Sequence, residues 1–255
     1  MITIKTKKDI SILREGGRRH AKILRELVSL AVPGAHSSEL NRHAEELIKK
    51  LGDKPSFLNY RPAGAKRPYP ASLCVSVNDE IVHGIPNEND KILKEGDIVG
   101  LDLGLSHHDL ITDMAVTIPV GHISPELEQL IRVTREALVA GIKVARGGNK
   151  IGDISSAIEQ HALKYGYGIV RELSGHGVGY SVHEAPYVPN FGNPGKGNIL
   201  RLGMVLAIEP MFNIGTSKTK LDKDGYTYRT ADGKPSAHFE HTILITTGDP
   251  EILTQ

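Results

Sequence analysis

The sequence predicts an α/β fold of the α+β kind, built from two similar halves that each run helix, helix and then strands. Two pairs of amphipathic helical stretches predict the halves, because Gly34 and Gly52 in the first pair recur at the same spacing as Gly148 and Gly166 in the second. Period-two alternation from residue 101 onward predicts a β-hairpin at the end of the first half. Chance similarity between two amphipathic helix pairs is the alternative to a true repeat.

The first half opens with two helices and a short strand. Thr6 followed by Asp9 indicates the start of a helix, whose apolar stripe runs to Gly34. A second helix is expected over about residues 38–51. The apolar segment 73–77 then predicts a strand.

The second half repeats this order. Ser124, Pro125 and Glu126 provide an N-cap serine, a first-turn proline and an acid near the positive end of the helix dipole. Another helix is expected over about residues 151–165. Three apolar segments then predict strands at residues 169–173, 204–208 and 242–247.

Composition and charge limit the function classes. The 255 residues suffice for one domain, whose halves we place at residues 7–120 and 124–247. The formal net charge of +1 provides no global attraction to DNA or a membrane. The single cysteine, Cys74, excludes a disulfide framework and favours a reducing compartment. Because neither a signal peptide nor a membrane span is recognisable, we expect a cytoplasmic protein.

The predicted hairpin carries two aspartates. If its turn centres on His107 and His108, an exposed tip, then Asp102 and Asp113 lie directly opposite each other. Their Cβ atoms would be about 4.5–5.5 Å apart, and two half-buried carboxylates so placed need a shared proton or a cation. Two solvated acids at a loop end are the alternative.

Three further residues are candidate ligands for such a cation. Glu209 follows the apolar run 204–208, and Glu240 precedes the apolar residues 242–245. A charged group beside a buried strand is almost never unpaired, so a salt bridge to a lysine or arginine is the alternative for each glutamate. His176 lies between two glycines, which allow the backbone to approach a ligand closely, although it could also be an ordinary loop histidine.

These five side chains would offer four carboxylates and one imidazole. That mixture suits Mn²⁺, Fe²⁺, Co²⁺ or Zn²⁺. Because four carboxylates carry more charge than one ion balances, two ions sharing bridging carboxylates fit better. Such pairs, about 3.5–4 Å apart, hold a hydroxide and polarise a carbonyl during hydrolysis.

Five motifs in order resemble those of the type I methionine aminopeptidases, and the resemblance covers nearly the whole chain. The motifs are residues 77–86, Asp102 with Asp113, residues 175–179 with His183 and Glu184, residues 208–211, and residues 239–242. The resemblance implies the pita-bread fold, in which two pseudo-symmetric halves with antiparallel sheets surround a dinuclear metal centre. It also implies one catalytic domain over residues 1–255.

The resemblance assigns roles in metal binding. Asp102 would chelate one ion, His176 and Glu209 would bind the other, and Asp113 and Glu240 would bridge both. The cofactor would be two divalent ions per chain, with Co, Mn, Fe and Zn as candidates.

The implied activity is removal of the N-terminal methionine from nascent proteins, with preference for a small second residue. A hydroxide bridging the ions would attack the scissile carbonyl, and Glu209 would also shuttle the proton. His183 would steady the carbonyl oxygen, and His83 would lie near the leaving nitrogen. Two rivals share the fold: an X-Pro aminopeptidase or prolidase-like hydrolase, and a non-catalytic binding protein.

The substrate pocket departs from the family pattern. Tyr69 and Cys74 fit the family's methionine pocket. A cysteine or threonine, a tyrosine, a phenylalanine and a tryptophan are frequent in relatives at the positions of Ala63, Lys66, Val182 and Tyr226. We therefore expect a wider or looser pocket.

A basic loop is a candidate for partner binding. Its members are Lys218, Lys220, Lys223 and Arg229. Relatives dock on ribosomal RNA near the peptide exit, so the resemblance implies ribosome docking of a monomer. A solvated turn is the alternative, because such a cluster gives a weak field at physiological salt.

Overall fold

The computed structural model describes residues 2–88 and 90–255. Its main element is a nine-stranded sheet in the order β1-β4-β5-β14-β9-β7-β8, with β2 also paired to β4 and β15 to β14. The pairings are antiparallel. The strands are β1 (Lys54–Pro55), β2 (Leu73–Val77), β4 (Ile98–His107), β5 (Leu110–Pro119), β7 (Gly175–Gly177), β8 (Glu184–Val188), β9 (Val205–Ile208), β14 (Glu240–Leu244) and β15 (Glu251–Ile252).

Two three-stranded sheets accompany the large one, in the orders β13-β10-β6 and β11-β12-β3. Their strands are β3 (Glu80–Val82), β6 (Gly168–Ile169), β10 (Met211–Asn213), β11 (Thr219–Leu221), β12 (Tyr228–Thr230) and β13 (Ser236–His238). Because β3 comes from the first half of the chain and β12 from the second, their pairing ties the halves together.

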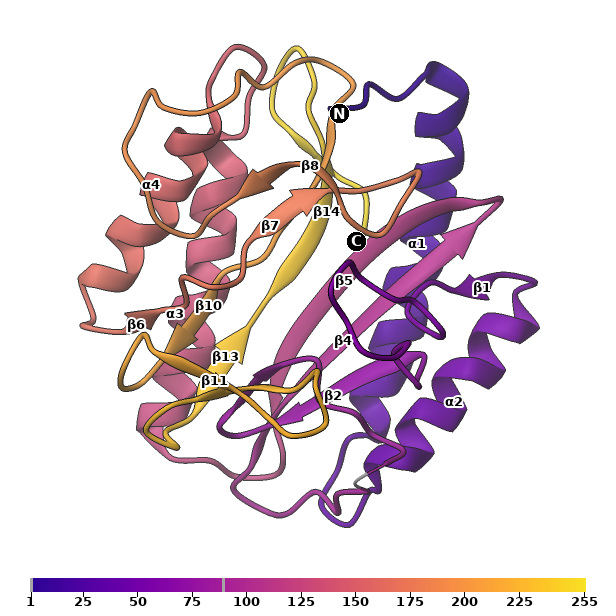
Figure 1. Ribbon diagram of the computed structural model, residues 1–255, viewed down its shortest axis with the longest axis vertical. Coiled ribbons are helices and arrows are strands. Elements are labelled where there is room, and N and C mark those ends of the chain that lie inside the picture. The colour runs from indigo at the N-terminus through magenta and orange to yellow at the C-terminus, as the bar shows by residue number, and fades with distance from the viewer. Residues whose placement is uncertain (1, 89) are drawn as a thin grey trace.

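Four helices flank the large sheet in the described residues: α1 (Lys7–Leu30), α2 (Ser37–Lys50), α3 (Pro125–Val144) and α4 (Ile151–Leu163). Figure 1 shows α1 and α2 on one side of the molecule and α3 and α4 on the other. The first pair shares a buried core with β2 and β4, and the second pair shares another with β9 and β14.

The predicted helix starts are confirmed. Thr6 and Asp9 form a capping box at α1, and the Ser124 hydroxyl accepts a hydrogen bond from the Leu127 N–H at α3. No helix in the described residues is both long and apolar enough to span a membrane.

The turn of the β4–β5 hairpin differs from the prediction. It consists of His108 and Asp109, which have φ angles of 47° and 62°, and His107 pairs with Leu110. Two consecutive left-handed residues form a two-residue hairpin turn. The predicted exposed tip is also wrong for His107, which is buried and whose Nδ1 lies 2.7 Å from Asp53 Oδ1.

This turn shifts the strand register away from the predicted one. Asp102 lies opposite Ala115, and Asp113 lies opposite Gly104. The two aspartates are therefore diagonal neighbours on one face of the hairpin, and their predicted direct pairing is wrong.

Two predicted strands also end elsewhere. The strand expected over residues 169–173 covers only Gly168 and Ile169, where its pairing with β10 ends. The strand expected over residues 242–247 runs from Glu240 to Leu244, and β15 follows it.

Candidate metal centre

The register of the large sheet aligns three of the predicted ligands. Asp102 on β4 pairs with Ala115 on β5, and Ala115 pairs on its other side with Glu240 on β14. Paired residues point to the same face of a sheet, and so do residues two apart on one strand. Asp113 therefore shares the face of Asp102 and Glu240.

The other two predicted ligands lie on the same face. His176 on β7 pairs with Ala207 on β9, and Ala207 pairs with Thr242 on β14, two residues after Glu240. Glu209 follows β9, two residues after Ala207. Strands from both halves of the chain thus bring all five side chains to one face of one sheet.

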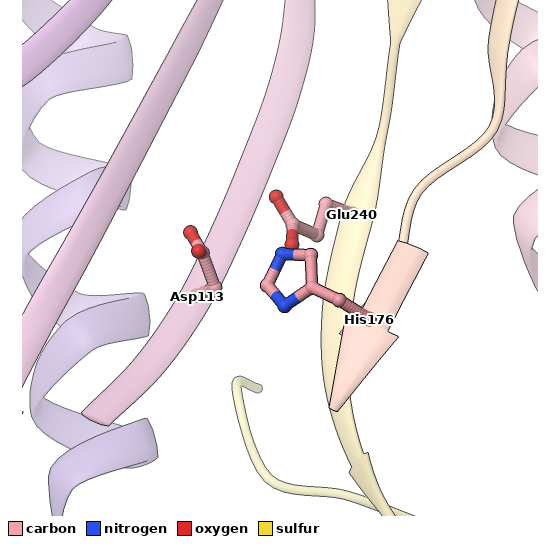
Figure 2. A group of neighbouring side chains, drawn as sticks. All are labelled: Asp113, His176 and Glu240. Carbon is pink, nitrogen blue, oxygen red and sulfur yellow. The ribbon is translucent and has the colours of Figure 1, made fainter. Parts of the chain in front are cut away.

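Three of the five side chains converge closely. Asp113, His176 and Glu240 each offer a ligand atom within 4.8 Å of the others. Figure 2 shows these side chains pointing toward one another from β5, β7 and β14. His176 Nε2 also lies 3.4 Å from Glu209 Oε1. Asp102 lies beside this group of three, on the neighbouring strand β4.

Thr242 fixes the backbone of Asp113 where the β5–β14 ladder ends. The last ladder pair is His241 with Met114. One residue further, the Thr242 hydroxyl accepts a hydrogen bond from the Asp113 N–H at 2.8 Å and donates one to the Asp113 carbonyl oxygen at 2.7 Å. The strands can therefore diverge while the position of Asp113 stays defined.

The four carboxyl groups are costly to ionise without a cation. Burial raises the pKa of Asp102 to about 7. Burial, followed by the charge of Asp102, raises the pKa of Asp113 well above its ordinary value. Burial, followed by the charge of Asp113, does the same to the pKa of Glu209 and of Glu240. A cation among these groups would favour their ionised forms.

The donor set fits a divalent cation. Three buried oxygens lack a hydrogen-bond partner in the described structure: Asp102 Oδ1, Asp113 Oδ1 and Glu240 Oε1. Among the described residues, no lysine or arginine forms an ion pair with these carboxylates or with Glu209; Glu209 and Glu240 lie instead 3.4–3.9 Å from the Nε2 atoms of His176 or His238. The salt-bridge and solvated-pair alternatives are therefore wrong, and the oxygen-rich set with one imidazole suits hard to borderline ions.

The tautomer and orientation of His176 suit a metal ligand. Its Nδ1 lies 2.9 Å from the Gly177 carbonyl oxygen, which can only accept, so Nδ1 carries the proton. Burial, followed by the proximity of His183, lowers the pKa of His176 to about 3. The neutral ring therefore presents the Nε2 lone pair, and the carbonyl fixes its orientation as outer-shell partners of metal-binding histidines do.

Sequence reasoning missed His238, a buried residue at the end of β13. Its Nε2 has no hydrogen-bond partner in the described structure and lies 3.8 Å from Glu209 Oε2 and 3.9 Å from Glu240 Oε2. Burial, followed by the proximity of His83, lowers the pKa of His238 to about 3. Its place two residues before Glu240 is the signal that could have found it, since such residues share a face in extended chain.

The predicted pocket residues form one cluster beside Asp102. Tyr69, Cys74, Val182 and Tyr226 pack together with Phe57, Ala71 and Ile85. The Tyr69 and Tyr226 rings meet edge to face, with centroids 5.2 Å apart. Cys74 pairs with Asp102 across β2 and β4, so the cluster adjoins the carboxylates. Ala63 and Lys66 are exposed and lie outside it.

The two predicted substrate histidines lie near the carboxylate cluster. The His183 ring contacts the His176 ring at a centroid distance of 4.4 Å. Burial, followed by the proximity of His183, lowers the pKa of His83 to about 4. Sequence reasoning missed Tyr60, whose hydroxyl lies 2.8 Å from His183 Nδ1. No local pattern indicates this contact, because the two residues are 123 positions apart.

The predicted basic loop is less basic than its sequence indicates. Lys218, Lys220 and Lys223 are exposed. Arg229, in contrast, forms ion pairs with three carboxylates: those of Asp79, Glu80 and Asp222. Its charge is therefore neutralised within the molecule.

A model of metallopeptidase family M24 matches residues 11–247. The chain belongs to this family. A methionine aminopeptidase from Clostridium perfringens is 45% identical over 254 residues, covering 100% of this chain and 99% of that one. The crystal structure of a methionine aminopeptidase from Thermotoga maritima matches with a TM-score of 0.95 at 44% identity and covers 100% of both chains. The resemblance to the methionine aminopeptidases and the pita-bread fold are thereby confirmed.

The prolidase branch of the M24 family is more distant. A prolidase from Pyrococcus furiosus matches with a TM-score of 0.77 at 25% identity, and the chain covers 65% of that protein. Within the M24 metallopeptidases, which are hydrolases, this chain therefore groups with the methionine aminopeptidases.

Proposed function

We propose that the chain removes the N-terminal methionine from nascent proteins, with preference for a small second residue. The observation that carries the proposal is the cluster of four carboxylates and His176, all buried except the partly exposed Glu209, directly beside the pocket around Tyr69. The printed names of the relatives supply the substrate class. Residues 1–255 would act as one catalytic domain, with the site between its two pseudo-symmetric halves.

The cluster would hold two divalent ions. Asp102 would bind one ion, His176 and Glu209 the other, and Asp113 and Glu240 both. Co, Mn, Fe and Zn all suit this donor set. Divalent ions bound here supply a water of lowered pKa and polarise the scissile carbonyl.

Three residues of the chain would handle protons and orientation. Glu209, whose side chain is 13% exposed, would take a proton from the attacking water and pass it to the leaving nitrogen. Without ions, burial raises the pKa of Glu209 well above its ordinary value, and bound ions would favour the ionised form that accepts the proton. His183 would hold the carbonyl oxygen, and His83 would lie beside the leaving nitrogen.

The methionine side chain would enter the cluster formed by Tyr69, Cys74, Val182 and Tyr226. Its walls are apolar and buried, which suits a thioether chain. The small Val182 leaves room, so we expect weak discrimination among peptides that begin with methionine, norleucine or leucine. Comparing their kcat/KM values tests this expectation, and a strong preference for methionine would contradict the looser pocket.

The test of function is hydrolysis of a Met-Ala-Ser peptide by Mn²⁺- or Co²⁺-loaded protein. We expect free methionine as product, and Glu209→Gln should lower kcat by about 10²–10⁴-fold while the fold persists. Glu26→Gln, an exposed change on α1, is the matched control. Cleavage of an X-Pro peptide instead would favour the prolidase rival, and no cleavage of either would favour a binding protein.

The same proposal places the enzyme, as a monomer, in the cytoplasm near the ribosome. The exposed residues Lys218, Lys220 and Lys223 would contact ribosomal RNA. Reversing all three charges should weaken sedimentation with ribosomes at low salt, and unchanged binding would rule this surface out. Arg229 is left out of this surface because its charge is already paired.

A further inference from the structure

The N-terminal segment lies against the loop that carries His183. Ile2 forms an isolated parallel bridge with Ala185, just beyond this loop. The Lys5 N–H donates to the Gly203 carbonyl oxygen at 2.8 Å. We call residues 179–184 the His183 loop, and its last residue, Glu184, forms an ion pair with Lys5.

Lys5 is an unusual lysine because its side chain is fully buried. Its Nζ lies 2.7 Å from Glu184 Oε2, and the side-chain exposures of the two residues are 0% and 6%. The Thr3 hydroxyl contacts both groups, and the Lys5 ammonium lies 4.5 Å from the centroid of the Tyr180 ring. A buried charge is costly unless it is paired, and separating a buried ion pair is strongly destabilising. The Lys5–Glu184 pair therefore holds the two side chains in one position relative to each other.

The other oxygen of Glu184 closes the His183 loop. Glu184 Oε1 accepts hydrogen bonds from the backbone N–H of Tyr180 at 2.6 Å and of Ser181 at 3.2 Å. Gly179 opens the loop with a φ angle of 137°, and the Lys5 side chain occupies the space where a Cβ would lie. One carboxylate thus shapes the loop and joins it to Lys5.

A second tie runs parallel to the first. The Tyr180 hydroxyl donates to Asp9 Oδ2 at 2.6 Å, so the first turn of α1 holds the same loop. His183 directly precedes Glu184, and its ring contacts His176 at a centroid distance of 4.4 Å. Any shift of Glu184 would therefore move His183 relative to the carboxylate cluster.

We propose that Lys5 is a positioning residue: through Glu184 it fixes the His183 loop and thereby the imidazole that holds the substrate carbonyl. This inference rests on the proposed function of His183. Among the described contacts, Lys5 itself touches neither the pocket cluster around Tyr69 nor the four carboxylates of the candidate metal centre. Its loss should therefore lower kcat without changing metal affinity.

The test compares Lys5→Met with Lys8→Met, a matched change at an exposed lysine in the first turn of α1. On a Met-Ala-Ser peptide with Mn²⁺, we expect Lys5→Met to lower kcat about 5–20-fold, at or below the low end of the about 10–100-fold that loss of an outer-shell partner costs. KM and Mn²⁺ affinity should stay within about twofold. Hydrogen exchange at the Tyr180 and Ser181 amides should accelerate, whereas Lys8→Met should leave all four quantities unchanged.

A double-mutant cycle with His183→Ala separates positioning from general destabilisation. In the His183→Ala background, Lys5→Met should change kcat by less than about twofold, because there is no imidazole left to misplace. An equal loss in both backgrounds, or no loss in either, would overturn the proposal. If Lys5→Met does not fold, Glu184→Gln takes its place in the same cycle.

The two proposals fail in distinguishable ways. If wild-type protein does not cleave the peptide, or if His183→Ala is fully active, the proposed function or the role of His183 is wrong. Accelerated exchange in Lys5→Met would then still show that Lys5 fixes the loop. Unchanged exchange in an otherwise active enzyme would reject the role of Lys5 alone.

Discussion

The metal-ligand face of the sheet and the substrate wall beside it hold their residues in different ways. The ligand face consists of five side chains on or next to strands of one sheet, where backbone register sets their positions. The substrate wall consists of residues 57–69 and the His183 loop. Here side-chain hydrogen bonds, rather than strand register, set the positions of the residues. Substitutions on the face should therefore change metal binding, and substitutions on the wall should change substrate geometry.

The largest effect should come from Asp113→Asn on the ligand face. Losing an outer-shell partner of a metal ligand costs about 10–100-fold, so losing a ligand should cost more than about 100-fold in both kcat/KM and Mn²⁺ affinity. Asp109→Asn is the matched control, since it changes an exposed aspartate on the same hairpin. If Asp113→Asn bound Mn²⁺ as tightly as wild type, the claim that substitutions on the ligand face change metal binding would be wrong.

Removing metal should make stability depend on pH. Carboxyl groups with raised pKa values bind protons in the folded state that the unfolded chain releases. Their favourable contribution is complete below the ordinary pKa of about 4 and is lost as pH rises through the Asp102 value of about 7. The buried histidines, among them His83, His176 and His238 with pKa values of about 3 to about 4, oppose this trend below their ordinary value of about 6.5, because there the unfolded chain protonates them and the folded chain does not. The Tm of chelator-treated protein should therefore fall between about pH 7 and about pH 8.

Adding Mn²⁺ should restore the Tm most strongly at the high end of this range, because the ion favours the ionised carboxylates. Thermal unfolding monitored by circular dichroism measures both curves. A metal-free Tm that rises between about pH 7 and about pH 8 would show that the face does not carry the buried negative charge we assign to it.

The ligand face was largely readable from the sequence because its residues interrupt regular patterns. Asp102 and Asp113 break the apolar periodicity of long strands, and Glu209 and Glu240 flank apolar runs. The register was misjudged by two residues because the left-handed turn starts at His108, and neither turn residue is a glycine or an asparagine, the usual signals of such a turn.

The substrate wall was only partly readable. The pocket residues came from the family resemblance, and the structure gathers them into one cluster, of which Tyr69 and Val182 lie on this wall. The contacts of Tyr60 with His183 and of Lys5 with Glu184 were missed, because they join segments far apart in the chain and leave no periodic signal. His238 was missed although it is only two residues from Glu240, because it lies outside the motif of residues 239–242 that identified Glu240.

His238→Ala tests whether the ligand face is larger than the five predicted residues. Its unpartnered Nε2 lies near one oxygen each of Glu209 and Glu240, so removing the ring should lower Mn²⁺ affinity by about 10–100-fold. Calorimetric titration of the variant measures this, with the exposed His122→Ala as control. If the variant bound Mn²⁺ with the affinity of wild type, His238 would not contribute to metal binding, and the ligand face would consist of the five predicted residues.

The smallest effect should come from Tyr60→Phe on the substrate wall. The change removes the hydroxyl at His183 Nδ1 and keeps the ring. One neutral hydrogen bond contributes about 0.5–1.5 kcal/mol, so kcat should fall about 2–10-fold. Mn²⁺ affinity should be unchanged, because Tyr60 acts only on the orientation and tautomer of His183.

Tyr187→Phe is the matched control, since that ring is 72% exposed and its hydroxyl has no hydrogen bond among the described residues. Steady-state kinetics of both variants at saturating Mn²⁺ gives the comparison. Equal kcat values would mean that Tyr60 does not orient His183. A loss of Mn²⁺ affinity in Tyr60→Phe would mean that the wall and the ligand face are coupled, since a hydroxyl that contacts no ligand would then influence the ions through the contact between His183 and His176.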